Sequence, residues 1–148
     1  MPTPNFPPTD VALTDRGFIT RPWYPLLKFW DSAIRMSGIG YTPGAGGTVT
    51  QATSKSTGVT LNKATGRITM NAAALAAATV VSFTLTNSAI EATDLLVLNH
   101  VSGGTAGAYT LNAQCAAGSA SINVRNASAA SLSESVVIGF AIFKGRTA

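Results

Sequence analysis

The chain has 148 residues, which is enough for one compact domain and a small appendage. Only 11% of its residues are charged, against about 25% in an average soluble domain, while 46% are hydrophobic, so we expect a surface rich in Thr, Ser, Asn, Gly and Ala. The single Cys115 excludes an intrachain disulfide, and with His100 as the single histidine it excludes a Cys/His zinc site within one chain. These values favour a structural or binding protein. We predict no enzymatic activity, no cofactor and no metal site.

The formal net charge of +4 raises the question of nucleic-acid binding. The ten Lys and Arg residues are scattered, no two of them are adjacent, and no glycine-aromatic RNA-binding pattern lies among them. We therefore expect no nucleic-acid partner. An anionic surface on a neighbouring subunit suits such diffuse charge equally well.

Composition divides the chain into three parts. All seven prolines and both tryptophans lie before residue 44, whereas the rest is rich in Thr, Ser, Ala and Asn. Residues 41–47 are a run of residues that break helices, which is typical of a short hinge. The sequence thus predicts an N-terminal arm at 1–40, a Gly-rich hinge at 41–47 and a body at 48–148.

The arm is expected to begin as an extended, proline-rich segment through Gly17 and to continue as one short helix from Pro22 to about Met36. Along this helix the large apolar side chains recur every three or four residues and form one broad face. A helix this short is marginal alone, so its face either packs onto its own body or docks on another protein or on copies of itself. We favour docking, and the predicted docking residues are Trp23, Tyr24, Leu26, Leu27, Phe29, Trp30 and Ile34.

The body is predicted to be a succession of short strands. Strands are expected at 48–53, 59–61, 67–70, 80–86, 94–101, 109–113, 122–124 and 135–143. The turn at 62–66 indicates a hairpin, residues 72–78 form either one or two helical turns or a loop, and the apolar run at 94–101 predicts a strand buried on both faces. Residues 68–90 carry no charge, but their many Thr, Ser and Asn residues argue against membrane insertion. This spacing predicts a mainly β fold, an antiparallel β-sandwich of the jelly-roll type.

The last strand is apolar on both faces. One face is expected to join the core, and the other to lie under a loop or to contact a neighbouring subunit. The candidate subunit-interface residues are Val136, Ile138, Phe140, Ile142 and Phe143.

Few residues are arranged for catalysis. Glu91 and Asp94 are the nearest carboxylates, and solvation is their expected fate. His100 forms a Ser/His/Asp set with Asp94 only if the fold brings them together, and a threefold assembly offers the further option of three His100 side chains around an ion. We expect Cys115 to be a small buried apolar group.

Two segments resemble parts of tailed-bacteriophage virion proteins. Gly17-Phe-Ile-Thr-Arg-Pro-Trp23-Tyr24 and the residues after it resemble a short segment near the N-terminus of many such proteins. The runs 50–63, 66–71, 82–88, 100–104, 125–126 and 139–143 resemble a β-knob at the C-terminus of phage fibres and other phage structural proteins. The resemblance implies a homotrimeric fibre that is assembled in the host cytoplasm, docks on tail or capsid proteins through residues 1–40 and exposes its knob for host attachment.

The chain departs from longer fibres because it has no shaft and no long repeats. A short tail fibre, a head fibre and a decoration protein therefore remain open. A carbohydrate-binding module that contacts host glycans through an exposed Tyr109 or through loop asparagines such as Asn87 and Asn126 is the alternative from another class, and a small hydrolase that uses His100 is a third.

Overall fold

The computed structural model describes residues 14–15, 18–19, 41 and 43–145. The chain divides into two compact units, residues 1–40 and 41–148, and each is described by itself. In the first unit, β1 (Thr14–Asp15) pairs antiparallel with β2 (Phe18–Ile19). The helix predicted at 22–36 lies outside the described residues.

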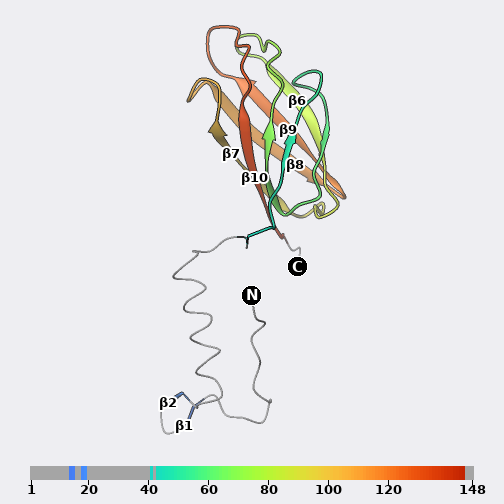
Figure 1. Ribbon diagram of the computed structural model, residues 1–148, viewed down its shortest axis with the longest axis vertical. Coiled ribbons are helices and arrows are strands. Elements are labelled where there is room, and N and C mark those ends of the chain that lie inside the picture. Colours follow the sequence, from blue (N-terminus) through green and yellow to red (C-terminus); the bar gives the residue numbers. More distant parts are fainter. Residues whose placement is uncertain (1–13, 16–17, 20–40, 42, 146–148) are drawn as a thin grey trace. The chain divides into compact units, whose positions relative to one another are not determined.

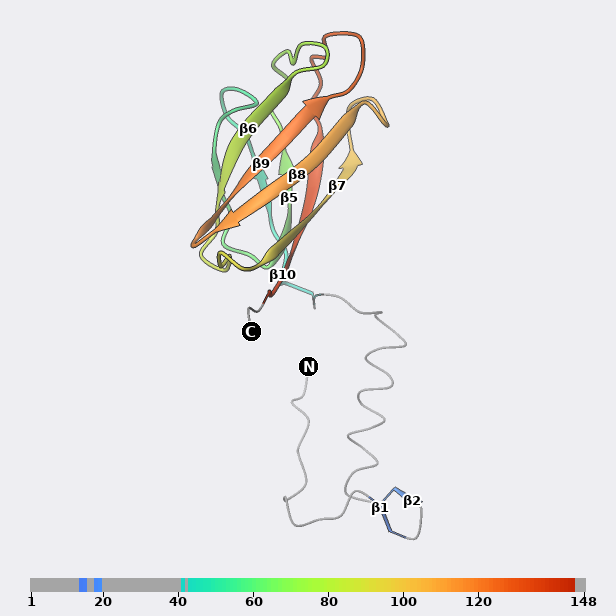
Figure 2. The same ribbon diagram turned by 180° about the vertical axis from the view of Figure 1, so that it is seen from behind.

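The second unit is built from strands, and its described residues contain no helix. The strands are β3 (Thr48–Thr50), β4 (Val59–Thr60), β5 (Thr65–Thr69), β6 (Val80–Thr86), β7 (Leu95–Ser102), β8 (Tyr109–Ala116), β9 (Ser119–Asn126) and β10 (Val137–Phe143). They form two four-stranded sheets, which Figures 1 and 2 show as two layers. The β10 sheet has the order β3-β5-β10-β7, and the β9 sheet has the order β4-β6-β9-β8. The prediction of a mainly β fold is confirmed.

Both sheets are mixed, so the expectation of a purely antiparallel fold is wrong. β3 runs parallel to β5, and β4 runs parallel to β6, while the remaining pairs are antiparallel. The predicted hairpin across residues 62–66 is also wrong, because β4 and β5 belong to different sheets. This turn passes the chain from one layer to the other.

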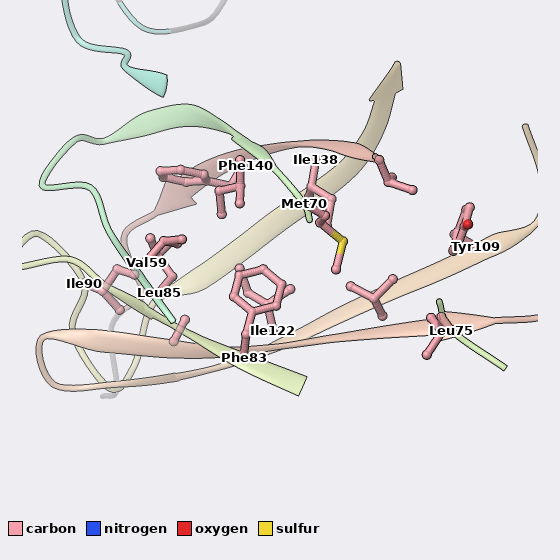
Figure 3. Close-up of a cluster of buried hydrophobic side chains, with 14 of the residues drawn as sticks. Val59, Met70, Leu75, Phe83, Leu85, Ile90, Tyr109, Ile122, Ile138 and Phe140 are labelled. Atoms are coloured by element: carbon pink, nitrogen blue, oxygen red, sulfur yellow. The ribbon is translucent and has the colours of Figure 1, made fainter. Parts of the chain in front are cut away.

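The core lies between the two sheets. β6 shows how the sequence builds it, because Phe83 and Leu85 are buried while the alternating Ser82, Thr84 and Thr86 are exposed. In Figure 3, Ile138 and Met70 lie in the layer opposite Phe83 and Ile122. Burying an aliphatic or aromatic side chain of this size contributes about 1.5–3 kcal/mol, so this shared cluster stabilises the pairing of the sheets.

Buried amides hold the long loops in place. Asn126 is fully buried, and its amide nitrogen donates to the carbonyls of Leu75 (2.9 Å) and Ala130 (2.7 Å). Leu75 also pairs with Leu132 in an isolated β-bridge. Residues 72–78 therefore form a loop, the second of the two predicted options, because they are pinned to a distant loop rather than coiled on themselves.

β7 differs from its prediction. Leu96 and Leu98 pack against the core, but Leu95, Val97 and Val101 are exposed. The predicted burial of both faces of this strand is thus wrong within the single chain.

Candidate functional site

The last strand does not present the interface that was predicted from its apolar residues. Val136, Ile138, Phe140 and Ile142 are at most 4% exposed and belong to the core, so they have no surface to offer to a second subunit. The prediction that these four residues form a subunit interface is therefore wrong. Phe143, the fifth candidate, is 57% exposed.

The exposed side of the same strand belongs to an apolar surface. We name it the β7–β10 face, and it comprises Leu95, Val97 and Val101 of β7 with Val137, Ala141 and Phe143 of β10. Pairing between the two strands sets Phe143 opposite Leu95 and Ala141 opposite Val97. Because alternate residues of a strand point to the same side, these side chains share the outer surface of the β10 sheet.

A groove of about 560 Å³ runs over the middle of this sheet. Its floor contains Gly139 and Ala141, whose small size leaves space between the taller Val97 on β7 and Arg67 on β5. Gly139 cannot carry a larger side chain without movement, because a Cβ there would lie 2.8 Å from Cγ2 of Val101. Gly46, Gly47 and Thr48 also line the groove, so the end of the predicted hinge lies along the sheet.

The outer surface of the β9 sheet has the opposite character. A ladder of polar side chains crosses its strands: the Ser82 hydroxyl donates to Oδ1 of Asn123 (2.5 Å), and Nδ2 of Asn123 donates to Oδ1 of Asn112 (2.7 Å). The three residues are direct neighbours in the strand pairing; Ser82 and Asn112 are exposed, and Asn123 is partly exposed. Arg125 of β9 is exposed on the same side, two residues from Asn123, and the polar groups of this surface suit contact with water.

A carboxylate organises the loop between β7 and β8. Glu134 accepts hydrogen bonds from the Thr105 backbone N–H (2.9 Å), the Thr105 hydroxyl (2.6 Å) and the Tyr109 hydroxyl (2.7 Å). These donors, the Thr105 hydroxyl above all, favour the ionised form and lower the pKa of Glu134. Burial, and then Glu134 itself, raise the pKa of Tyr109. No local sequence pattern predicts this cluster, because Tyr109 and Thr105 lie 25 and 29 positions from Glu134.

Lys55 lies beneath the same loops. It is only 3% exposed, and its ammonium donates to the carbonyls of Asn71 (2.6 Å) and Glu134 (2.5 Å). Burial lowers its pKa, and the nearby Glu134 charge opposes that shift. Two carbonyl acceptors and a nearby carboxylate indicate that this lysine is a structural tie between loops.

The predicted carboxylate pair forms an ion-pair cluster. Lys144 lies 2.8 Å from Asp94 and 3.3 Å from Glu91. Asp94 also accepts from the backbone N–H groups of Glu91 (2.8 Å) and Gly145 (3.2 Å). The hydrogen bond from Lys144 is the main cause of the lowered pKa of Asp94. Because Asp94 is ionised and its oxygens are hydrogen-bonded within the chain, its role is to hold the end of β10 in place and not to act as an acid or base in catalysis.

The arrangement of His100 and Asp94 considered for catalysis does not form. Asp94 directly precedes β7, and His100 is six residues along this strand, about 20 Å away at the usual rise. The His100 ring instead hydrogen-bonds the Gly103 carbonyl and meets the Tyr109 ring edge-on at a centroid distance of 5.9 Å. Burial raises the pKa of the partly buried Cys115, which makes it a poor nucleophile.

The residues proposed for glycan contact are not available for it. Asn87 and Asn126 are fully buried, and Tyr109 is 8% exposed with its hydroxyl bound to Glu134. Both asparagine amides are used inside the chain, Asn87 through the Lys63 carbonyl (2.7 Å) and the Ala89 N–H (3.0 Å). A glycan site built on these three residues is therefore wrong.

The predicted docking residues Trp23, Tyr24, Leu26, Leu27, Phe29, Trp30 and Ile34 lie outside the described residues. Within the described ranges, no three His, Cys, Asp or Glu side chains are grouped so that they could hold a metal ion. The same ranges contain no helix long and apolar enough to span a membrane.

Comparison of the chain with protein-family models, curated proteins and solved structures found no match. The function must therefore be inferred from the surfaces of the second unit and from the sequence resemblance.

Proposed function

We propose that this chain is a non-enzymatic structural protein of a tailed-bacteriophage particle. In this proposal residues 1–40 dock on a tail or capsid protein, and the second unit is a β-sandwich knob that associates into a homotrimer. The observation that carries the proposal is the pair of unlike outer surfaces: a neutral polar ladder on the β9 sheet and the apolar β7–β10 face on the β10 sheet.

The two surfaces support a subunit of an assembly. An exposed apolar patch of this kind marks a binding surface more often than a surface left to water. The polar ladder suits the side of a knob that faces solvent. The buried, hydrogen-bonded amides make the loops rigid, which is what a subunit of a particle needs.

The attachment to a phage rests on the sequence resemblance, so its test is made on particles. The double variant Trp23→Ala/Trp30→Ala should be absent from purified particles while its circular dichroism matches that of the wild type, because the changes remove the two largest predicted anchors. The amount in particles is measured against the major capsid protein by quantitative mass spectrometry. Val80→Ala, an exposed change on the β9 sheet, is the control and should be incorporated normally.

Full incorporation of the double variant would overturn the docking role of the arm. Labelling the wild-type chain on particles for electron microscopy then separates a tail fibre from a head fibre or decoration protein. Absence of the wild-type chain from particles would overturn the proposed function as a whole.

A further inference from the structure

We propose that the β7–β10 face is the surface through which one copy of this chain packs on another. The ridge formed by Leu95 and Val97 enters the groove over Gly139 and Ala141 of the neighbouring copy. The inference rests on the proposed assembly of the chain and adds the surface that performs it.

The β7–β10 face leaves large apolar side chains exposed in the single chain. Leu95 is 67% exposed, Phe143 57%, Val97 52% and Val101 39%. Leu95, Val97 and Phe143 lie close together on two adjacent strands, so their exposed areas join into one patch, whereas Val101 lies beyond the polar Asn99, which also lines the groove. With the usual areas of such side chains, the four together leave about 400 Å² of apolar surface in water, which is within the range of functional patches on single chains.

The size of the sheet fits what a stable contact needs. The strands lie about 4.8 Å apart and rise about 3.3 Å per residue, and they have eight, seven, five and three residues in β7, β10, β5 and β3, so the face is roughly 19 Å wide and its length falls from about 26 Å at β7 to about 10 Å at β3. Two copies that bury their exposed apolar side chains, about 400 Å² on each, remove about 800 Å² of apolar surface from water, and with the polar residues around them the contact reaches the roughly 1,000 Å² in total that a specific interface needs. The apolar patch would occupy the middle of that contact, and the threonines of β3 and β5 would form its rim.

The shape of the face is complementary to itself. The ridge on β7 and the groove over β10 lie side by side, since Val97 and Ala141 are paired neighbours. If the copies are related by a rotation axis parallel to the strands, each copy inserts its ridge into the groove of one neighbour. Its own groove then receives a ridge, from the same neighbour in a dimer and from the other neighbour in a trimer. Such an arrangement closes with two or three copies and leaves no ridge uncovered.

The edge strands of this sheet also favour a second copy of the chain as the partner. β7 is an edge strand with no charged residue and no proline along its length, although natural edge strands are usually protected by such residues. β3, the opposite edge strand, has only three residues. Among the described residues that line the groove, Arg67 is the one charged side chain, so the surface suits an apolar partner such as a second copy rather than a nucleic acid or a glycan.

The test uses the full chain and two variants that differ only in which sheet they alter. Val97→Lys places a charge on the ridge, whereas Val80→Lys places the same charge on the β9 sheet at a similar exposure, 57% against 52%. Light scattering on a sizing column is expected to give three times the single-chain mass for the wild type and for Val80→Lys, and the single-chain mass for Val97→Lys. Circular dichroism checks that all three are folded.

A second variant avoids the introduction of charge. Ala141→Phe fills the groove with its own side chain and should also reduce the mass to that of one chain or weaken the association at least tenfold.

If Val97→Lys and Ala141→Phe keep the wild-type mass, or if Val80→Lys loses it equally, the surface assignment is overturned. A monomeric wild type overturns it too and points to a different protein as the occupant. Incorporation into particles is measured separately, so the failure of this inference remains distinct from failure of the proposed function.

Discussion

Two carboxylates in this chain are held ionised by hydrogen-bond donors, most of them from distant segments. Asp94 is bound by Lys144 and by two backbone N–H groups, and Glu134 is bound by Thr105 and Tyr109. In each case the hydrogen bonds lower the pKa of the folded carboxyl below its ordinary value. Unfolding raises these pKa values again, so between the folded and unfolded values the unfolded chain binds more protons. Both carboxylates therefore stabilise the fold above the unfolded pKa, and this contribution is lost as the pH falls.

We predict that the thermal unfolding midpoint is constant above about pH 5 and falls steadily below about pH 4.5. Glu134→Gln should lower the midpoint by several degrees at neutral pH, because it loses the charge-assisted bonds that hold the β7–β8 loop. It should also show a smaller acid-induced fall than the wild type, since one of the two titrating groups is gone. Calorimetry across this pH range measures both effects.

Glu91→Gln is the matched control for this experiment. Glu91 contacts Lys144 at 3.3 Å with more than half of its side chain exposed, and exposed ion pairs of this kind contribute little to stability. Its midpoint should follow the wild-type curve. A Glu134→Gln curve that runs parallel to the wild type down to acid pH would contradict the role assigned to Glu134.

At the scale of elements, the sequence predicts where the strands lie better than it predicts which strands pair. β6 follows from strict alternation, because Phe83 and Leu85 must face a core while Ser82 and Thr84 face water. The turn at 62–66 is equally visible, but its residues specify only that the chain turns. Whether the next strand returns to the same sheet depends on pairing with β10, more than 65 residues away, which no local pattern encodes. The apolar run of β7 likewise does not reveal which of its faces the fold covers.

The β7–β8 loop offers a test of backbone geometry. Gly103 and Gly107 both have positive φ, +68° and +79°, but a Cβ at Gly103 would collide with the Ser135 carbonyl oxygen, whereas a Cβ at Gly107 would meet no atom within 4 Å. Gly107→Ala should lower the free energy of unfolding by about 1–2 kcal/mol through backbone strain alone. Gly103→Ala should cost about 1–3 kcal/mol more, because the loop carrying Ser135 must move. Urea unfolding of both variants measures the difference, and equal losses would show that the contact is readily relieved.

At the scale of the molecule, the candidate surface could be predicted only in part. The sequence indicates that β10 is apolar on both sides, and one side does face outward. It does not indicate which side, and the interface predicted from sequence therefore includes the core residues Ile138 and Phe140 and omits Leu95 and Val97. The contrast between the two outer surfaces emerges only when the sheets are assembled, because each surface collects residues from strands far apart in the chain.

The same contrast determines how assembly should respond to salt. Each copy carries a formal charge of +4, and the proposed contact is apolar, so charges on the copies repel one another weakly and do not drive the association. Raising NaCl from about 0.1 M to about 1 M shortens the Debye length from about 10 Å to about 3 Å, which should leave the association constant of the full chain unchanged or slightly increased. Ammonium sulfate should strengthen the association further, because sulfate favours the burial of apolar surface. Sedimentation equilibrium measures both series, and a steep loss of association with NaCl would show that ion pairs outside the β7–β10 face hold the copies together.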